Sequence, residues 1–265
     1  GAATVVADLA GEKVADLLLI NDRDLSYAKL RFDDRSIATL KTHLGKFDDA
    51  LARALCWASI WDMHRDAEIS SSDFIEIALN GLAGETDDAI VNIVLMQLNT
   101  SVEAYAKDSN RAAYREKLAN GLWALTQNSA PGSDLQLLIS RAFAINAQTP
   151  EQTAKIRELL NGGAPGLKVD TDLRWYFLIA LTERGATTKA ELDAELATDN
   201  TTTGNLAFET CLAAMPNNEA KAYAFNKVLN EDIVTSIRTA LIVGFQRPIQ
   251  RNLLEPFITL YFENL

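Results

Sequence analysis

The chain of 265 residues has few of the side chains that usually carry chemistry, with only two histidines and two cysteines. His43 and His64 lie in separate segments, and Cys56 and Cys211 lie far apart. Zinc sites built on one segment need close ligand pairs such as HExxH or CxxC, and neither pattern occurs. The sequence therefore predicts no metal or other cofactor in this chain, and it favours buried, reduced thiols over a disulfide.

Motifs of other catalytic classes are also missing. The chain has no GxSxG nucleophile elbow, no GxxxxGK[ST] phosphate loop and no GxGxxG dinucleotide loop. Neighbouring acids are frequent, as in "FDD" (47–49), but at helix starts such residues usually cap the helix. We therefore predict no catalytic residue in this chain.

Basic residues are outnumbered, with 25 Lys and Arg against 36 Asp and Glu, for a net charge of −11. This balance argues against nucleic acid and against an anionic membrane surface as partners. No apolar run approaches the ~20 residues of a membrane span, and no charged segment precedes "VADLLLI" (14–20) as in a signal peptide. With the reduced cysteines, these features predict a cytoplasmic location.

Residues 1 to about 33 differ from the rest of the chain. In "SYAKLRF" (26–32), Tyr27, Lys29 and Arg31 alternate with Ala28, Leu30 and Phe32. This period of two predicts a half-buried strand, and the short apolar runs before it predict two more. Because three short strands rarely form a stable sheet alone, we expect this segment to belong to a sheet completed by other residues.

From Ser36 onward the pattern is helical. "TPEQ" (149–152) has the residues of a capping box with proline at the first helical position, and "SDLQ" (133–136) and "TKAE" (188–191) are similar helix starts. The predicted helices cover 36–44, 48–64, 72–82, 87–106, 109–127, 134–147, 150–161, 171–184, 189–198, 202–214, 217–229, 232–244 and 248–264.

Short loops join these helices, so neighbouring helices should be antiparallel. A dozen such helices cannot surround one bundle core, but they can stack in two layers. The predicted fold is therefore mainly α, an irregular two-layer α-solenoid of the HEAT type, preceded by a few strands. No sequence period is visible.

His64 lies within the segment "ALCWASIWDMHRDAEIS" (54–70), and two interpretations of it are open. It could border an active site, or it could be a structural histidine in the last helical turn, where the helix dipole favours a cation. Trp57 and Trp61 lie on the apolar face of this helix, which favours the structural interpretation and a place in the core for both.

Two arginines are candidates for contact with a peptide. Arg141 interrupts the apolar helix "LLISRAFA", so its charge must reach solvent or be paired. Arg174 follows the caps of its helix, and it pairs either with Asp170 one turn earlier or with a ligand carboxylate on an open surface.

Several stretches, among them "DDALARALCWASIWDMHRDAEIS" and "VDTDLRW", together resemble the C-terminal part of actinobacterial aminopeptidase N enzymes, which are zinc metallopeptidases of the M1 family. The helical region is similar to the ERAP1-like C-terminal domain. The similar stretches cover residues 16–36, 48–70, 131–144, 169–175 and 244–265.

The resemblance implies that residues 1–33 are the last strands of an incomplete β-sandwich. It implies that residues 34–265 are the bowl-shaped helical domain covering a catalytic cleft, cut before its C-terminal end. The family's HExxH and GxMEN motifs have no counterpart here, so no catalytic residue is carried over. Zinc is expected only in the parent enzyme.

The expected function is that of a non-catalytic domain that walls the substrate cavity of an aminopeptidase and controls peptide access. Its partners would be the catalytic domain of the same polypeptide and peptide substrates, which Arg141 and Arg174 would contact. The alternative is a free-standing α-solenoid scaffold that binds a protein on its concave face.

Overall fold

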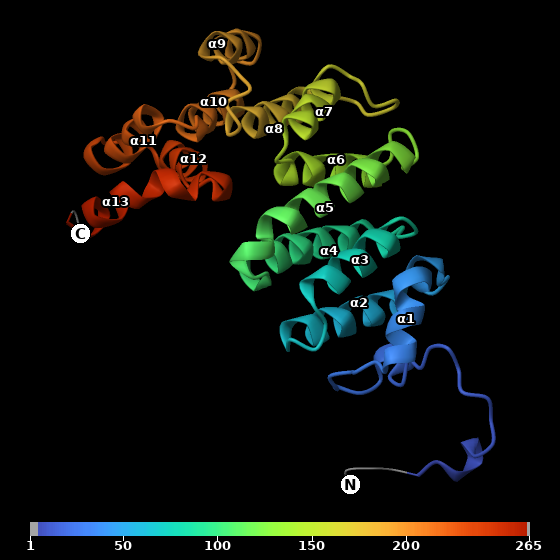
Figure 1. Cartoon of the computed structure of the whole chain (residues 1–265). Helices are drawn as coiled ribbons and strands as arrows, with labels where there is room; N and C mark the ends of the chain where they lie inside the picture. The colour runs from blue at the N-terminus through green and yellow to red at the C-terminus, as the bar shows by residue number, and fades with distance from the viewer. Residues whose placement is uncertain (1–4, 264–265) are drawn as a thin grey trace. The chain divides into compact units, whose positions relative to one another are not determined.

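The computed structural model of the chain describes residues 5–263, which are mainly helical (Figure 1). Every predicted helix from Ser36 onward has a counterpart, apart from residue 264, which lies outside the described residues. The helices are α1 (Asp34–His43), α2 (Ala50–Arg65), α3 (Ser71–Leu82), α4 (Asp88–Thr100), α5 (Asp108–Asn128), α6 (Asp134–Asn146), α7 (Pro150–Leu160), α8 (Thr171–Thr182), α9 (Lys189–Thr198), α10 (Thr202–Ala214), α11 (Asn218–Asn230), α12 (Thr235–Phe245) and α13 (Arg251–Glu263).

The predicted helix ends differ in two places. The segment expected at 87–106 leaves α-helical geometry after Thr100 and finishes as the π-turn Ser101–Tyr105. The segment expected at 248–264 begins with the short 3-10 turn Pro248–Gln250 and continues as α13. Elsewhere the ends agree within about three residues, because side-chain caps set them locally.

The prediction of strands before residue 34 is wrong for the described part, residues 5–33. Figure 1 shows an open trace there, which contains only the 3-10 turns Ala7–Leu9 and Asp22–Asp24. The alternation is nevertheless real, since Leu30 and Phe32 are each only 7% exposed. Phe32 lies against a helix: its amide donates to Met63 Sδ of α2 at 3.4 Å. An extended segment can thus bury one face on a helix without forming a β-ladder.

Side-chain caps begin most of the helices. At α7 the Thr149 hydroxyl accepts from the Gln152 amide at 3.2 Å, and the Gln152 side chain accepts from the Thr149 amide at 3.2 Å. This confirms the predicted capping box. The predicted starts at Ser133 and Thr188 are also capped by their hydroxyls. Local sequence therefore determines where these helices begin.

The chain divides into two compact units, Gly1–Tyr114 and Arg115–Leu265, and the division falls within α5. In unit 1, α1 and α2 pack on α3, and α3 packs on α4. The ends of α1 and α3 approach so closely that a Cβ on Gly84 would lie 2.1 Å from the Gly45 carbonyl oxygen. Glycine at this crossing lets the two backbones touch. A domain boundary near residue 33 stays a prediction.

In unit 2, α7 and α10 pack on α8, and α12 packs on α10 and α11. Ala213, Ala224 and Leu241 form a buried cluster where α10, α11 and α12 meet. Fully buried Phe143 and Phe177 provide large side chains to the core of α6 and α8. Small residues at one crossing and large ones at another set how closely each helix pair packs.

Candidate functional site

His64 is a buried structural side chain with 5% exposure. Its Nδ1 lies 2.9 Å from the Ile69 carbonyl oxygen, and its ring stacks on Phe74 with centroids 4.8 Å apart. Burial lowers its pKa, and the hydrogen bond to Ile69 only partly opposes this. The structural interpretation is confirmed. The prediction that His64 is a cation at the helix C-terminus is wrong, because burial of the ring favours its neutral form.

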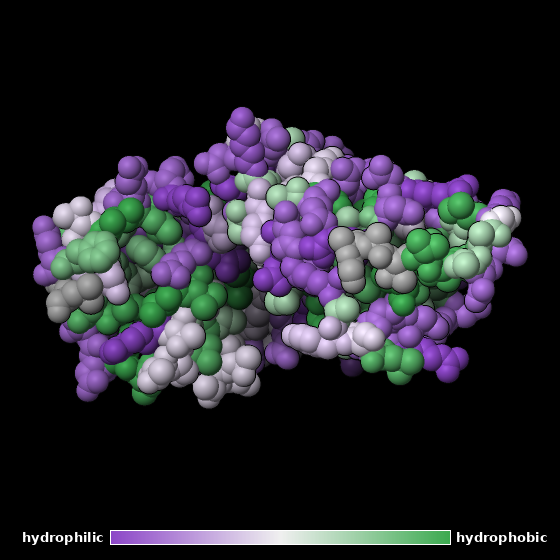
Figure 2. Space-filling model, turned by 90° about the horizontal axis from the view of Figure 1, so that it is seen from below, coloured by the Kyte–Doolittle hydropathy of each residue, from purple (hydrophilic) through white to green (hydrophobic). Residues whose placement is uncertain are grey.

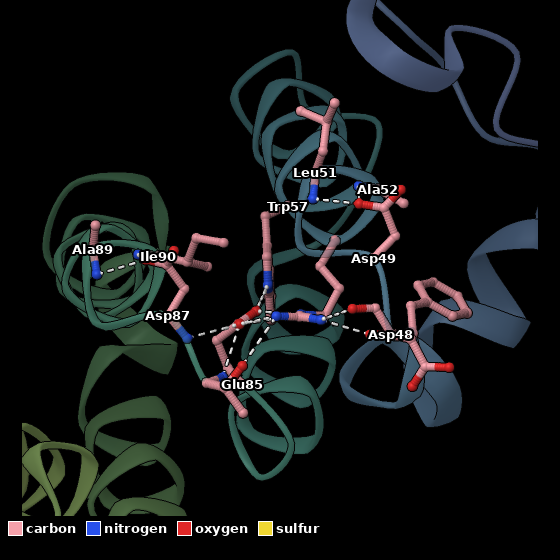
Figure 3. Close-up of polar contacts among 12 residues, drawn as sticks. Asp48, Asp49, Leu51, Ala52, Trp57, Glu85, Asp87, Ala89 and Ile90 are labelled. Atoms are coloured by element: carbon pink, nitrogen blue, oxygen red, sulfur yellow. Dashed lines mark hydrogen bonds and ion pairs between the residues drawn. The ribbon is translucent and has the colours of Figure 1, made fainter.

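The tryptophans of α2 differ in their surroundings. Trp57 is buried and donates its indole N–H to Glu85 Oε2 at 3.1 Å (Figure 3). The same carboxylate accepts from Arg53 Nε at 3.1 Å and from the backbone amide of Thr86 at 2.9 Å. Trp61 is half-buried and stacks on Tyr105 with centroids 5.8 Å apart.

This arrangement, the Glu85 cluster, is internally satisfied. Arg53 also donates to the Phe47 carbonyl oxygen at 2.6 Å and to the Thr86 hydroxyl at 3.2 Å. Arg53 and Glu85 are 5% and 3% exposed. With its donors and acceptors engaged inside the protein, the cluster stabilises the packing of unit 1 and leaves little capacity to bind a ligand. Sequence analysis missed it, because its two charges are 32 residues apart.

The other possible metal-ligating and nucleophilic side chains are two buried cysteines and the exposed His43. Burial raises the pKa of both Cys56 and Cys211 to about 12, and both thiols are free. His43 Nδ1 contacts the Thr42 hydroxyl at 2.7 Å. Within residues 5–263, no three His, Cys, Asp or Glu side chains come together as a metal site. The zinc expected of a parent enzyme therefore does not fit the described residues of this chain.

Arg174 is engaged by a partner that sequence analysis did not identify. Its Nε and Nη2 donate to the two carboxylate oxygens of Glu195 in α9 at 2.7 and 2.6 Å. The expected local pair with Asp170 is not the one that forms, since Asp170 caps the Leu173 amide at 2.9 Å. The Arg174 side chain is 40% exposed. A bidentate pair occupies one edge of the guanidinium and leaves Nη1 for other contacts.

Arg141 is arranged differently. Its guanidinium carbon lies 5.3 Å from the centre of the Tyr176 ring, a cation–π contact between α6 and α8. Its Nε is buried and has no hydrogen-bond partner among residues 5–263. No acid of these residues forms an ion pair with it. The guanidinium donors of Arg141 are therefore free, whereas two of those of Arg174 are bonded to Glu195.

The end of α8 carries a buried ionic network. Glu183, only 4% exposed, pairs with Arg184 at 2.6 Å and with Arg247 Nε. Gln250 donates to the carbonyl oxygens of Glu183 and Ala214 at 2.6 and 2.7 Å. Glu183 and Arg184 directly follow α8, whereas Arg247 and Gln250 lie 64 and 67 residues beyond Glu183, so no local sequence signal brings those two to it.

Hydrophobic side chains gather on another surface of unit 2. A hollow of about 1020 Å³ lies between α11, α12 and α13 and is lined mainly by Phe225, Phe245, Phe257, Ile258 and Tyr261. In Figure 2 hydrophobic residues are visible at the left, where Figure 1 places these helices, and also at the right of the view. Ile258 and Phe262 are 57% and 68% exposed. None of the helices in residues 5–263 combines the length and apolar character needed to cross a membrane.

Comparison with known proteins agrees with the mainly helical fold. The chain belongs to the ERAP1-like C-terminal domain family, whose pattern matches residues 17–265. It is 40% identical over 268 aligned positions to a protein called Aminopeptidase N from Streptomyces lividans. The alignment covers 100% of this chain and 31% of that relative, so the chain spans about a third of the relative's length. The predicted resemblance to an actinobacterial aminopeptidase N is confirmed.

Proposed function

We propose that this chain is a non-catalytic domain of a zinc aminopeptidase, walling the substrate cavity and controlling which peptides reach the catalytic domain. The identity of 40% to an Aminopeptidase N along the whole chain carries this proposal. The placement of the reactive side chains supports it: His64 is stacked in a core, and thiols with pKa values of about 12 are not nucleophiles at neutral pH.

In this proposal, residues 34–265 form an irregular two-layer α-solenoid. The segment before them belongs to a different domain of a longer polypeptide. That segment exposes large apolar side chains, such as Val5 at 92% and Leu25 at 84%. Apolar side chains on an irregular segment gain free energy when another surface covers them. The catalytic domain, with its zinc, would lie in the same polypeptide, and the location would be cytoplasmic.

Arg141 and Arg174 are the proposed peptide contacts. Arg174 has Nη1 available beside its pair with Glu195, which suits a single hydrogen bond to a peptide carbonyl. Arg141 has more free donors, which suits a charged group of the peptide. An aminoacyl dye is too short to reach beyond a catalytic domain, whereas a longer peptide is not.

The test is a kinetic comparison in the longer polypeptide that contains this chain. Arg141→Ala and Arg174→Ala should raise KM for peptides of eight or more residues several-fold, and change kcat/KM for an aminoacyl dye less. The control is Arg238→Ala, which removes an exposed arginine of α12. Equal effects of the arginine variants on both substrates, or no effect on either, would show that these arginines do not contact the peptide.

A further inference from the structure

Helix α9 (Lys189–Thr198) lies at the outer edge of unit 2, beyond α8 and α10 (Figure 1). Leu192 is the only buried residue among the ten of α9, all of which the structure describes. By contrast, α8 buries seven of its twelve residues. Burial of apolar side chains therefore contributes little to holding α9 in place, whereas it is the main stabilisation of α8.

Carboxylates of α9 provide its contacts with α7 and α8. Glu191 and Glu195 are one helical turn apart, so they lie on the same face of the helix. Glu191 accepts from both Nη atoms of Arg157 in α7. Glu195 accepts from Nε and Nη2 of Arg174 in α8 at 2.7 and 2.6 Å. Two bidentate ion pairs thus join α9 to two different helices.

Solvent reaches both of these ion pairs. The side chains of Arg157 and Glu191 are 32% and 35% exposed, and that of Arg174 is 40% exposed. A further charged contact, that of Lys189 with the Phe208 ring of α10, has a distance of 5.6 Å to the ring centre. Ion pairs that solvent reaches contribute little individually, and they weaken as salt screens them. The attachment of α9 should therefore depend on ionic strength.

The chain on either side of α9 is attached more firmly. Asp199, directly after α9, is buried and accepts from the Trp175 indole and from the Thr201 hydroxyl, each at 2.8 Å. Before α9, the hydroxyl of buried Thr182 lies 2.8 Å from that of Thr187. With both flanking segments held by such bonds, α9 can leave the surface without moving α8 or α10.

We propose that α9 opens as a local unit while α7, α8 and α10 stay folded, and that its ion pairs with Arg157 and Arg174 control this opening. A helix of ten residues is too short to be stable alone in water, so α9 should lose its helical hydrogen bonds when it is released. Segments with few buried apolar contacts are those that open below the free energy of global unfolding.

Opening would free both guanidinium groups at once and uncover the Phe208 ring. In its closed state α9 is therefore a cover over a basic and aromatic surface of unit 2, and ionic strength would control how often that surface is accessible. This conformational device does not rest on the proposed function, because it requires no peptide.

The test is amide hydrogen exchange of the 265-residue chain at neutral pH, followed by NMR and corrected for intrinsic exchange rates. The amides of α9 should exchange at least about tenfold faster than those of α8. Between about 0.05 and 0.5 M NaCl, exchange in α9 should accelerate about threefold or more, whereas exchange in α8 should not accelerate.

Glu195→Gln separates the ion pair with Arg174 from the intrinsic stability of the helix. Glu195 lies in the last turn, where the helix dipole disfavours a negative charge, so its loss alone would slightly stabilise an isolated helix. The variant should instead accelerate exchange in α9 about three- to fivefold and reduce the effect of salt.

The matched control is Asp193→Asn, which removes the same charge from the same helix. Asp193 accepts from Lys189 at 2.7 Å, and this partner belongs to α9 itself. Loss of such a pair within one helix should change exchange in α9 by less than about twofold.

Exchange in α9 as slow as in α8, or exchange that does not accelerate with salt, would overturn the proposal. Both readouts use the unmodified chain, so they hold even where a variant is unstable. Equal acceleration by Glu195→Gln and Asp193→Asn would contradict control by the ion pair, because the charge of the helix would then be the cause. Acceleration that spreads to α8 and α10 would show that α9 does not open as a separate unit.

Discussion

The guanidinium of Arg53 and the carboxylate of Glu85 form an ion pair buried in unit 1, with an Nε–Oε1 distance of 3.1 Å. Their side chains are 6% and 0% exposed. The pair joins α2 to the loop before α4, and Trp57 donates to the same carboxylate. Such pairs are costly to form but more costly to break, because either charge left alone remains desolvated.

Glu85→Gln should therefore lower the free energy of unfolding by about 3–5 kcal/mol at pH 7, measured by urea denaturation. The amide keeps the shape but leaves the Arg53 charge unpaired. Glu12→Gln, an exposed acid in the same unit, should change it by less than about 0.5 kcal/mol. A loss of similar size in both variants would contradict a special role for the pair.

Lowering the pH should destabilise the protein by protonating Glu85 of the same pair. The pKa of Glu85 is lowered: burial acts to raise it, but the hydrogen bonds from Arg53, Thr86 and Trp57 together outweigh burial. In the unfolded chain Glu85 binds its proton at a higher pH than in the folded protein. Its stabilisation is therefore complete above about pH 5 and is lost as the pH falls through the folded pKa. Glu85→Gln should flatten the dependence of stability on pH below 5.

His64 should titrate below its ordinary value of 6.5, because burial lowers its pKa. As the pH falls below 6.5, His64 is protonated in the unfolded state before it is protonated in the folded state. The free energy of unfolding therefore decreases until the pH passes the lower pKa of the folded state. The NMR signals of the His64 ring report the midpoint directly. His64→Phe should keep the ring stacking and weaken the pH dependence, whereas exposed His43→Gln should keep it. A midpoint above 6.5 would show that the ring is not desolvated.

Lys221 is a buried lysine of α11 whose Nζ donates to the carbonyl oxygens of Ala213, Gly244 and Phe245 at 2.8, 3.3 and 3.2 Å. Burial, followed by the charge of Arg247, lowers its pKa to about 8 from an ordinary value of 10.5. Between these values the unfolded state holds the extra proton. The Lys221 contribution therefore makes stability rise with pH by about 2–3 kcal/mol from pH 8 to 10.5.

Lys221→Met should remove this rise, which denaturation at several pH values would measure. Lys117→Met, at an exposed position of α5, should leave the rise in place. An unchanged rise in Lys221→Met would mean that other groups produce the pH dependence.

The chain by itself, supplied with Zn²⁺, should release no N-terminal amino acid from peptides. The proposed function assigns the reaction to another part of a longer polypeptide. Chromatography of peptide digests would detect the free amino acid. Release that is lost in His64→Phe or His43→Gln would mean that this chain holds a reaction centre of its own.

The sequence by itself determined the helices and most of their starts. Thr149 and Gln152 are three residues apart, so the capping box they form depends on local geometry alone. The same holds for Ser133 and Thr188. Period-two alternation in 26–32 correctly predicted an extended segment with Leu30 and Phe32 buried, but a period does not specify the partner. Phe32 packs on α2 and not on a second strand, so the prediction of a strand was wrong.

Only the tertiary structure decided which charges meet. The sequence left Arg174 either to Asp170, one turn away, or to a ligand carboxylate, but Arg174 pairs with Glu195, which is 21 residues away. Arg53 and Glu85, like Arg247 and Glu183, become neighbours only when separate helices pack. A helix start depends on interactions within one turn, whereas an ion pair between elements depends on how distant surfaces fit together. For this reason the sequence indicated that Arg141 needed solvent or a partner, and only the fold placed it over Tyr176 with its donors free.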